Sequence, residues 1–129
     1  MPESTSIRTA LVTGGAKRLG RAIALALASN GWDVAVHCHR STAEAEATAA
    51  EIRERGRRAA VIQADLGKES EVAAILPKVH AALGPLTCLV NNASVFEMDK
   101  IETVTRDSWD RHIETGLRAP LVLSQLFAR

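Results

Sequence analysis

Short apolar runs alternate along this chain with longer stretches in which apolar residues recur at helical spacing. The apolar runs predict strands over Ile7–Thr13, Asp33–Cys38, Arg58–Ala64 and Leu86–Asn91. Strands that alternate with helices form parallel sheets, and right-handed crossover helices cover the two faces of such sheets. We therefore predict an α/β fold: a Rossmann-type parallel sheet of about four strands with flanking helices, in which residues 1–129 form a single domain.

Local signals place the ends of the first two helices. The first helix is expected to present one apolar face, made by Leu19, Ala22, Ile23, Ala26 and Leu27. It should end at Asn30–Gly31, because this pair is a helix stop signal. Ser41 followed by Glu44 has the sequence of a capping box, which predicts a second helix from there to about Arg55.

Two further helices are expected in the second half of the chain. A helical apolar pattern runs from Val72 to Leu83, and Pro77 inside this pattern should kink or divide the helix. Thr105 is suited to be the N-cap of a last helix that begins near Arg106.

Two features favour the presence of more protein after the last residue. The segment Leu121–Arg129 keeps its helical spacing and contains no residue that would end a helix. The segment Leu86–Val90 is uniformly apolar, as central strands are and edge strands are not. We therefore expect the sheet to continue beyond this strand.

Composition places the chain among soluble globular domains. Its 129 residues are 47% hydrophobic and 24% charged, which excludes a disordered or fibrous chain. The formal net charge is +1 with both signs interspersed, so we expect neither a nucleic acid nor a membrane surface as a partner. Cys38 and Cys88 are too few for a disulfide scaffold, and Met1–Thr9 lacks the apolar core of a signal peptide. These features predict a cytoplasmic protein.

A glycine-rich turn joins the first strand to the first helix. In Thr13–Gly20, Gly14 permits a tight turn and Gly20 lets the helix pack closely. The free N–H groups at the helix start would suit a phosphate. The turn does not match G-x-G-x-x-G, and it is not a P-loop because Arg21 and Ala22 stand where a P-loop has Lys and Ser or Thr. A phosphate cradle and a plain glycine-rich turn both remain open at this point.

The end of the second strand bears on the choice of nucleotide. A carboxylate about 20 residues beyond the glycine turn would bind the ribose of NAD, but the segment His37–Ser41 contains none. His39, Arg40 and Ser41 can instead donate hydrogen bonds to a 2′-phosphate, which favours NADP(H). A solvated basic loop is the alternative. His37 and His39 share a strand face, but no third ligand is evident, so we expect no metal site.

Three motifs follow one another along the chain: the glycine signature from Thr13 to Gly20, Asp65 after the third strand, and the Asn-Asn-Ala sequence at positions 91–93. In this order they resemble the motifs of the short-chain dehydrogenase/reductase family. The resemblance covers nearly the whole chain. It implies a Rossmann-type fold, truncated relative to the full family fold, that binds NADP(H). The cofactor contacts that it implies are Gly14, Arg18, Leu19, Gly20, His39, Arg40, Ser41, Asp65, Leu66, Asn91, Ala93 and Ser94.

Several residues are similar to those of the pteridine reductase branch of this family. Arg18 stands where most members have glycine, Ser94 replaces another usual glycine, and Phe96 follows two positions later. The resemblance implies that Arg18 and Ser94 contact both the cofactor and the substrate. It also implies that Phe96 stacks a pterin ring against the nicotinamide. The alternative role for Phe96 is that of a buried loop anchor.

The catalytic residues of the family are not found in this chain. The family uses an Asn, a Ser, and a Tyr and a Lys four residues apart, whereas this chain contains no tyrosine and has Gly116 where the Asn aligns. We therefore assign no catalytic residue. The last helix forms a dimer contact in the family, so Leu123 and Phe127 are expected to face either a partner subunit or the missing half.

The resemblance implies an NADPH-dependent oxidoreductase in which this chain supplies the cofactor-binding half. Such an enzyme would transfer a hydride to the C=N or C=O bond of a pterin or another small molecule, and the full-length protein is expected to be a homo-oligomer. Two alternatives are kept. The first is a catalytically inactive NADP(H)-binding module, which Gly116 favours. The second is an unstable, degenerate fragment without activity.

Overall fold

The predicted parallel sheet is present and has four strands. The structure, a computed structural model, describes residues 6–95 and 97–129. The strands are β1 Thr9–Val12, β2 Asp33–Cys38, β3 Ala59–Gln63 and β4 Cys88–Val90. They lie in the order β3-β2-β1-β4, and each neighbouring pair is parallel. The Rossmann-type α/β fold expected from the alternating pattern is therefore confirmed.

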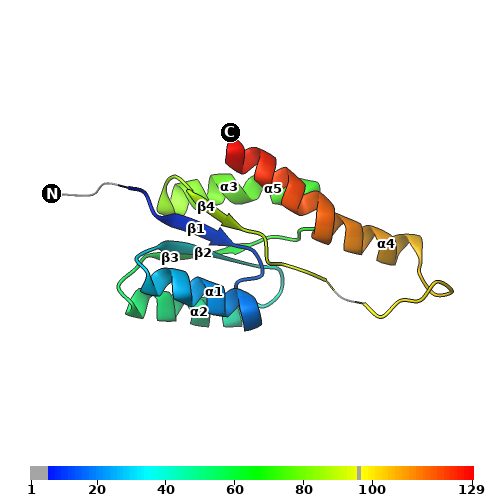
Figure 1. The fold of residues 1–129 in the computed structure, drawn as a ribbon, viewed down its shortest axis with the longest axis horizontal. Helices are drawn as coiled ribbons and strands as arrows, with labels where there is room; N and C mark the ends of the chain where they lie inside the picture. The colour runs from blue at the N-terminus through cyan, green and yellow to red at the C-terminus, as the bar shows by residue number, and fades with distance from the viewer. Residues whose placement is uncertain (1–5, 96) are drawn as a thin grey trace.

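Helices cover both faces of this sheet. The helical segments are α1 Arg18–Ser29, α2 Thr42–Glu54, α3 Glu69–Leu83, α4 Arg106–Ile113, the π-helical turn η1 Glu114–Arg118, and α5 Ala119–Ala128. Figure 1 shows α1 and α2 on one face, α3 and α5 on the other, and α4 reaching out beyond the sheet. Within the described part of the chain, no helix combines the length and the apolar character needed to cross a bilayer.

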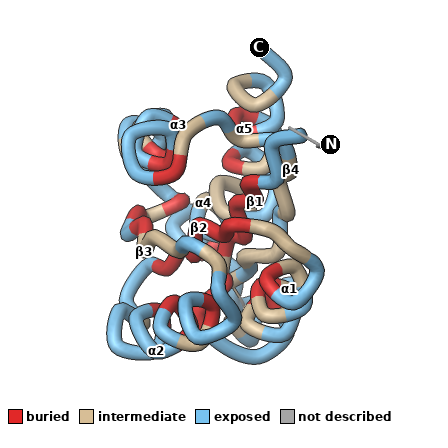
Figure 2. Tube along the Cα trace, turned by 90° about the vertical axis from the view of Figure 1, so that its left-hand side faces the viewer, coloured by how far each residue is buried: buried red, intermediate tan, exposed pale blue. Residues whose placement is uncertain are grey.

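Adjacent residues of one strand contribute to different sides of the core. Leu11 of β1 belongs to the cluster formed with α3 and α5, whereas Val12 belongs to the cluster formed with α1 and α2. Both side chains are fully buried. Successive strand side chains point to opposite faces, so one apolar run supplies both clusters. Figure 2 shows the buried residues gathered along the strands and the inward sides of the helices.

The buried face of α1 differs from the predicted one. Its buried residues are Gly20, Ala24 and Ala28. Leu19, which was expected on the buried face, is 66% exposed. Small residues spaced four apart form a flat stripe, which lets the helix backbone approach the sheet closely. Ile23 and Leu27 of the predicted face are partly buried and pack against the core cluster. The predicted face therefore lies beside the buried one and overlaps it only in part.

Two local expectations for α2 and α3 are also corrected. Ser41 is the N-cap of α2, but its side chain makes no capping hydrogen bond, so the box predicted with Glu44 is not formed. The helix α3 continues through Pro77 without a division. Pro77 lies on the exposed side of α3, where water can satisfy the carbonyl group left free by the missing N–H.

The end of the chain is not one continuous α-helix. Thr105 caps α4 as predicted, and Thr105 and Ser108 each accept the other's backbone N–H, at 3.1 and 3.0 Å. The turn η1, which contains Gly116, then separates α4 from α5. Glycine is a weak helix former, which favours such an interruption at this point. Leu123 of α5 is fully buried in the core cluster with α3, so it does not face a partner surface.

The strand β4 occupies an edge of the described sheet. It pairs with β1 on one side only, and its residues Cys88–Val90 are half-buried. The uniformly apolar sequence of β4 predicts that the sheet continues beyond this strand. Within the described residues no strand lies on the far side of β4, so the further strand stays a prediction.

Candidate functional site

The glycine turn is folded so tightly that two of its glycines have no room for a side chain. Gly14 has φ +62°, and a Cβ atom there would lie 2.9 Å from the Cα of Ala93. A Cβ atom on Gly20 would overlap the carbonyl oxygen of Gly14. Glycine at these positions therefore brings the first turn of α1 against the turn and against the segment after β4.

Thr13 and Asn92 join the glycine turn to the end of β4. The hydroxyl oxygen of Thr13 accepts hydrogen bonds from the backbone N–H groups of Asn92 and Ala93, both at 3.0 Å. The Asn92 side-chain amide donates to the carbonyl oxygens of Thr13 (3.1 Å) and Gly14 (3.2 Å). These bonds fix the positions of the two motifs relative to each other.

His37 joins the glycine turn to the end of β3. Its side chain is buried, and its Nδ1 accepts a hydrogen bond from the Gly14 N–H at 3.0 Å. Since Nδ1 accepts, the proton of a neutral ring is on Nε2, which donates to the carbonyl oxygen of Ala64 at 2.9 Å. Burial lowers the pKa of His37, and nearby His39 adds to this effect. We therefore assign the neutral Nε2–H tautomer.

The start of α1 offers backbone donors and a cation. Lys17 is the N-cap, and no side-chain hydrogen bond caps this end of the helix, so the first N–H groups lack intrahelical partners. Arg18 has φ +57°, a conformation that favours glycine. Among residues 6–95 and 97–129, no carboxylate pairs with the Arg18 guanidinium. The N–H groups at the start of α1 and the Arg18 guanidinium both suit an anionic phosphate.

A second group of donors lies where β2 ends and α2 begins. Arg40 is exposed, and within the described residues it forms no ion pair with a carboxylate. His39 is partly exposed, with its Nε2 3.8 Å from Oδ2 of Asp65. Ser41 is the N-cap of α2 with an unused side-chain hydroxyl at that cap. Together these groups can donate hydrogen bonds to one further phosphate.

The two candidate contacts after β3 have different surroundings. One carboxylate oxygen of Asp65 accepts the Gly67 N–H at 2.8 Å and so belongs to a local turn. The other oxygen is the one near His39. Leu66 is buried in the core, so only its backbone is available to a ligand.

The candidates after β4 line the opposite side of the glycine turn. Asn91 is exposed, and its side-chain amide donates to Oγ of Ser124 at 3.5 Å. Ala93 is partly buried, with its N–H bound to Thr13, and Ser94 is exposed. Phe96, the predicted stacking residue, lies outside the described residues.

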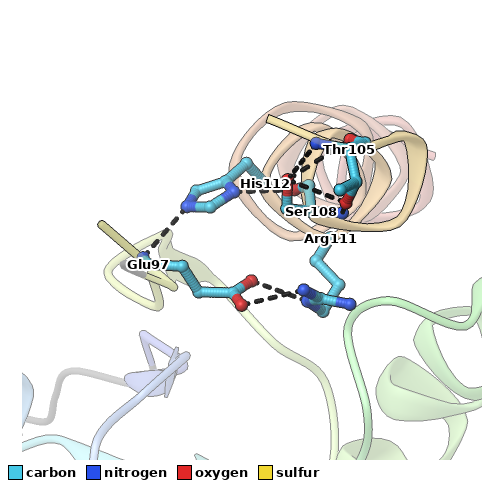
Figure 3. A network of polar contacts seen from close by, with 5 residues as sticks. All are labelled: Glu97, Thr105, Ser108, Arg111 and His112. Atoms are coloured by element: carbon cyan, nitrogen blue, oxygen red, sulfur yellow. Dashed lines mark hydrogen bonds and ion pairs between the residues drawn. The ribbon is translucent and has the colours of Figure 1, made fainter. Parts of the chain in front are cut away.

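The segment that follows is anchored to α4 at Glu97, as Figure 3 shows. The Glu97 carboxylate forms a two-pronged ion pair with Arg111, with N–O distances of 2.6 and 2.8 Å. This hydrogen-bonded partner lowers the pKa of Glu97. The Glu97 N–H donates to Nε2 of His112 at 3.2 Å, so Nδ1 of His112 carries the proton and donates to the Ser108 carbonyl at 2.7 Å.

An open cavity of about 320 Å³ lies beside this anchor. Its lining residues are Glu97, Met98, Asp99, Val104, Trp109, His112 and Ile113. Most of these side chains are apolar, which suits a flat organic ligand better than an ion.

Position 116, where the family's Asn aligns, has no side chain to contribute. Gly116 lies in η1, is exposed, and has open space where a Cβ would be. No cluster of three metal-ligating side chains occurs within residues 6–95 and 97–129. His37, which was considered as a ligand, uses both ring nitrogens in hydrogen bonds.

Sequence reasoning missed the residues that hold the site together. Thr13 and Asn92 stand inside the recognised motifs, so a search for hydrogen-bonding side chains within those motifs would have found them. His37 and His112 gave no such signal, because their partners are backbone groups of residues distant in the sequence.

Comparisons with known proteins agree with this arrangement. The family model described as short chain dehydrogenase matches residues 8–129. The 3-oxoacyl-[acyl-carrier-protein] reductase FabG of Staphylococcus aureus is 38% identical over 111 residues, which are 86% of this chain and 45% of that protein. The short chain dehydrogenase/reductase dpchG of Colletotrichum higginsianum is 35% identical over 123 residues, covering 95% and 46%. The chain thus spans about half the length of these relatives.

Solved structures resemble most of the chain. FolM alternative dihydrofolate reductase 1 from Brucella suis, in complex with NADP, has a TM-score of 0.86 and 43% identity, covering 92% of this chain and 49% of that one. A short chain dehydrogenase from Burkholderia cenocepacia, also in complex with NADP, has a TM-score of 0.91 and 41% identity, covering 95% and 50%.

Proposed function

Since the chain belongs to the short-chain dehydrogenase family, we propose that it is the NADP(H)-binding half of an oxidoreductase that resembles the pteridine reductases. The observation that carries the proposal is the donor group at the end of β2. Arg40 is exposed there without a carboxylate partner among the described residues, and no acidic residue occurs from His37 to Ser41. Such a group of hydrogen-bond donors can bind the 2′-phosphate that distinguishes NADPH from NADH.

Different residues of the chain would bind different parts of the cofactor. The glycine turn at Gly14 and the free N–H groups of Arg18, Leu19 and Gly20 would hold the pyrophosphate. His39, Arg40 and Ser41 would hold the 2′-phosphate. The adenine end of the cofactor would contact Asp65 and the Leu66 backbone. The nicotinamide end would contact Asn91, Ala93 and Ser94. When bound, NADPH supplies the hydride for the reduction.

The proposed substrate is a pterin or another small molecule with a C=N or C=O bond. Arg18 and Ser94 would contact both cofactor and substrate, and Phe96 would stack on the ring. The name of the Brucella protein, an alternative dihydrofolate reductase, supports a pterin-like substrate. The name of FabG supports a carbonyl substrate, which we keep as the second possibility within this class.

Proton transfer is assigned to residues outside this chain. The chain contains no tyrosine, and Gly116 has no side chain to offer. We therefore propose that the complete protein supplies the Tyr and Lys, that it is a homo-oligomer, and that it acts in the cytoplasm. A second candidate function, NADP(H) binding without turnover, is favoured by Gly116, because half of an active enzyme would keep the family's Asn at that position.

Nucleotide preference tests the shared part of both candidates. The chain is titrated with NADPH and with NADH, and binding is followed by nucleotide fluorescence or calorimetry. We expect Arg40→Ala to weaken NADPH binding about tenfold, because a charge-assisted hydrogen bond is lost, and to leave NADH binding unchanged. Arg106→Ala, which removes another exposed arginine far from the turn, is the control. Equal affinity of the unaltered chain for both nucleotides would refute the proposal.

The intact mass of the product in its native source separates the two candidates. A mass of about twice 13.8 kDa supports the oxidoreductase, and its remaining sequence should then contain the Tyr and Lys. A mass of 13.8 kDa supports the binding module. Steady oxidation of NADPH by the 129-residue chain with a dihydropterin would refute the binding module.

A further inference from the structure

We propose that His37 is a positioning residue of the cofactor site and that its Nδ1 atom holds the glycine turn in the shape that receives the pyrophosphate. This inference rests on the proposed NADP(H) binding. It adds a residue that supports the turn from within the core and has no contact of its own with the nucleotide.

The first support is the place of the imidazole in the fold. His37 lies in β2, two residues before His39, and the residue is only 2% exposed. One ring nitrogen accepts the Gly14 N–H (3.0 Å) and the other bonds to the carbonyl oxygen of Ala64 (2.9 Å). One side chain thus joins the glycine turn to the residue before Asp65. It also lies in β2, the strand that the proposed 2′-phosphate donors follow.

The second support is the backbone conformation of Gly14, the residue whose N–H binds His37. Gly14 has φ +62°, and glycine reaches many other conformations at similar energy. A glycine needs an external partner to remain in one of them. The next residue contributes a different bond, because the Gly15 N–H donates to the backbone carbonyl of His37 at 2.9 Å. His37 therefore binds two successive N–H groups of the turn, one through its side chain and one through its backbone.

The third support is directional. The bond to Gly14 needs an acceptor at Nδ1, whereas the bond to Ala64 needs a donor at Nε2. Only the neutral Nε2–H ring supplies both. The bond to Gly14 fixes the turn and the bond to Ala64 fixes the ring, so the two bonds have separable roles.

Asparagine and glutamine separate these roles. An asparagine side chain at position 37 places its carbonyl oxygen near the Nδ1 position, so His37→Asn retains an acceptor for Gly14 and loses the donor to Ala64. Glutamine extends its amide toward the Nε2 position, so His37→Gln retains the donor to Ala64 and loses the acceptor for Gly14. His37→Leu loses both. Each amide variant gives up one of the two bonds, which makes them a matched pair for stability.

The experiment measures NADPH affinity and stability for the three variants of the full 129-residue chain. Urea unfolding, followed by tryptophan fluorescence, identifies conditions in which every variant is folded. We expect His37→Gln and His37→Leu to weaken NADPH binding about tenfold, because the Gly14 N–H is left without its partner. We expect His37→Asn to bind within about twofold of the unaltered chain.

A purely structural role for His37 makes a different prediction. In that case NADPH affinity follows the loss of stability, and the Asn and Gln variants weaken binding equally. Equal weakening would overturn the inference. Absence of NADPH binding by the unaltered chain would instead overturn the proposed function itself, so the two failures are distinguishable.

Nitrogen NMR provides a readout that needs no nucleotide. Long-range ¹H–¹⁵N spectra at about pH 7.5, above the usual pKa of histidine, report which ring nitrogen carries the proton. We expect a protonated Nε2 and an unprotonated, hydrogen-bonded Nδ1 for His37. We also expect the Gly14 amide signal to shift in the Gln and Leu variants and to remain near its place in the Asn variant. An Nδ1–H tautomer, or an unmoved Gly14 signal in all three variants, would overturn the inference.

Discussion

The glycine turn and the segment after β4 are held by the same kind of bond, made by two histidines that differ in burial. In each, a histidine ring accepts a backbone N–H with one nitrogen and donates to a carbonyl with the other. His37 holds Gly14 through Nδ1, whereas His112 holds Glu97 through Nε2. His37 is buried in the core, but His112 is only partly buried and stands beside an exposed ion pair.

This difference shows how burial decides what a hydrogen bond contributes. Both N–H groups lie in part-buried bonds, but the second bond of His37, to the Ala64 carbonyl, is buried. A buried polar group that loses its partner has no water to replace it, so the loss costs the full desolvation of that group. A group nearer the surface exchanges one partner for another at little cost. We therefore expect changes at the glycine turn to affect the whole fold and changes at Glu97 to affect only the local segment.

The largest effect is expected from adding a side chain where α1 contacts the glycine turn. Gly20→Ala places a Cβ atom on the Gly14 carbonyl and should lower the free energy of unfolding by about 3 kcal/mol or more, as overpacking of a rigid backbone does. Gly116→Ala is the control from the second half of the chain, where the space is open. It should raise stability by about 0.5–1 kcal/mol. Urea unfolding measures both, and similar effects of the two substitutions would contradict the comparison.

Removing the two histidines should give unequal losses. We expect His37→Leu to lower the free energy of unfolding by about 2 kcal/mol, because the buried bond to the Ala64 carbonyl and the part-buried bond from the Gly14 N–H are both lost. We expect about 0.5 kcal/mol or less for His112→Leu, because the Glu97 N–H can bind water. Chemical denaturation at neutral pH checks this prediction. An equal loss for the two variants would show that burial does not govern these bonds.

Acid should affect the two regions differently. Burial lowers the pKa of His37 in the folded chain, so below the usual value of 6.5 the unfolded chain takes up the proton first. Stability from this group is therefore complete above pH 6.5 and is lost as the pH falls, by at most about 1.4 kcal/mol per pH unit. The measurement is the difference in unfolding free energy between the unaltered chain and His37→Asn from about pH 8 to about pH 5. A difference that is constant with pH would count against a neutral buried ring.

The smallest effect is expected at the exposed ion pair. Glu97→Gln removes the carboxylate that binds Arg111, and it should leave global stability nearly unchanged while the Glu97 amide exchanges its hydrogen faster. Arg111 lowers the pKa of Glu97, so the same local loosening should appear in the unaltered chain as the pH falls below the usual 4.5 of a glutamate. Hydrogen exchange read at single residues tests both. A global loss of stability in Glu97→Gln would place this segment within the core.

The sequence was sufficient for the sheet because its signals are local. β2 begins and ends at the predicted residues, since an apolar run between turn residues defines a buried strand without further context. The glycine turn and the Thr105 cap were likewise readable from adjacent residues. The pattern also gave the correct number of strands and their alternation with helices.

The parts that escaped prediction depend on contacts between distant residues. The buried face of α1 is set by how closely Ala24 and Ala28 approach the sheet, which apolar size does not reveal. The turn η1 depends on what surrounds it in space. His37 was considered as a possible ligand beside His39, but its true partners lie 23 and 27 residues away.

The backbone of Arg18 bears on any attempt to improve this protein by selection. Its φ of +57° costs a residue with a side chain about 1 kcal/mol relative to glycine. A library screened only for heat resistance would therefore enrich Arg18→Gly and discard the guanidinium at the start of α1. Laboratory evolution of this chain needs a nucleotide present during selection, so that position 18 is selected for nucleotide binding as well as for stability.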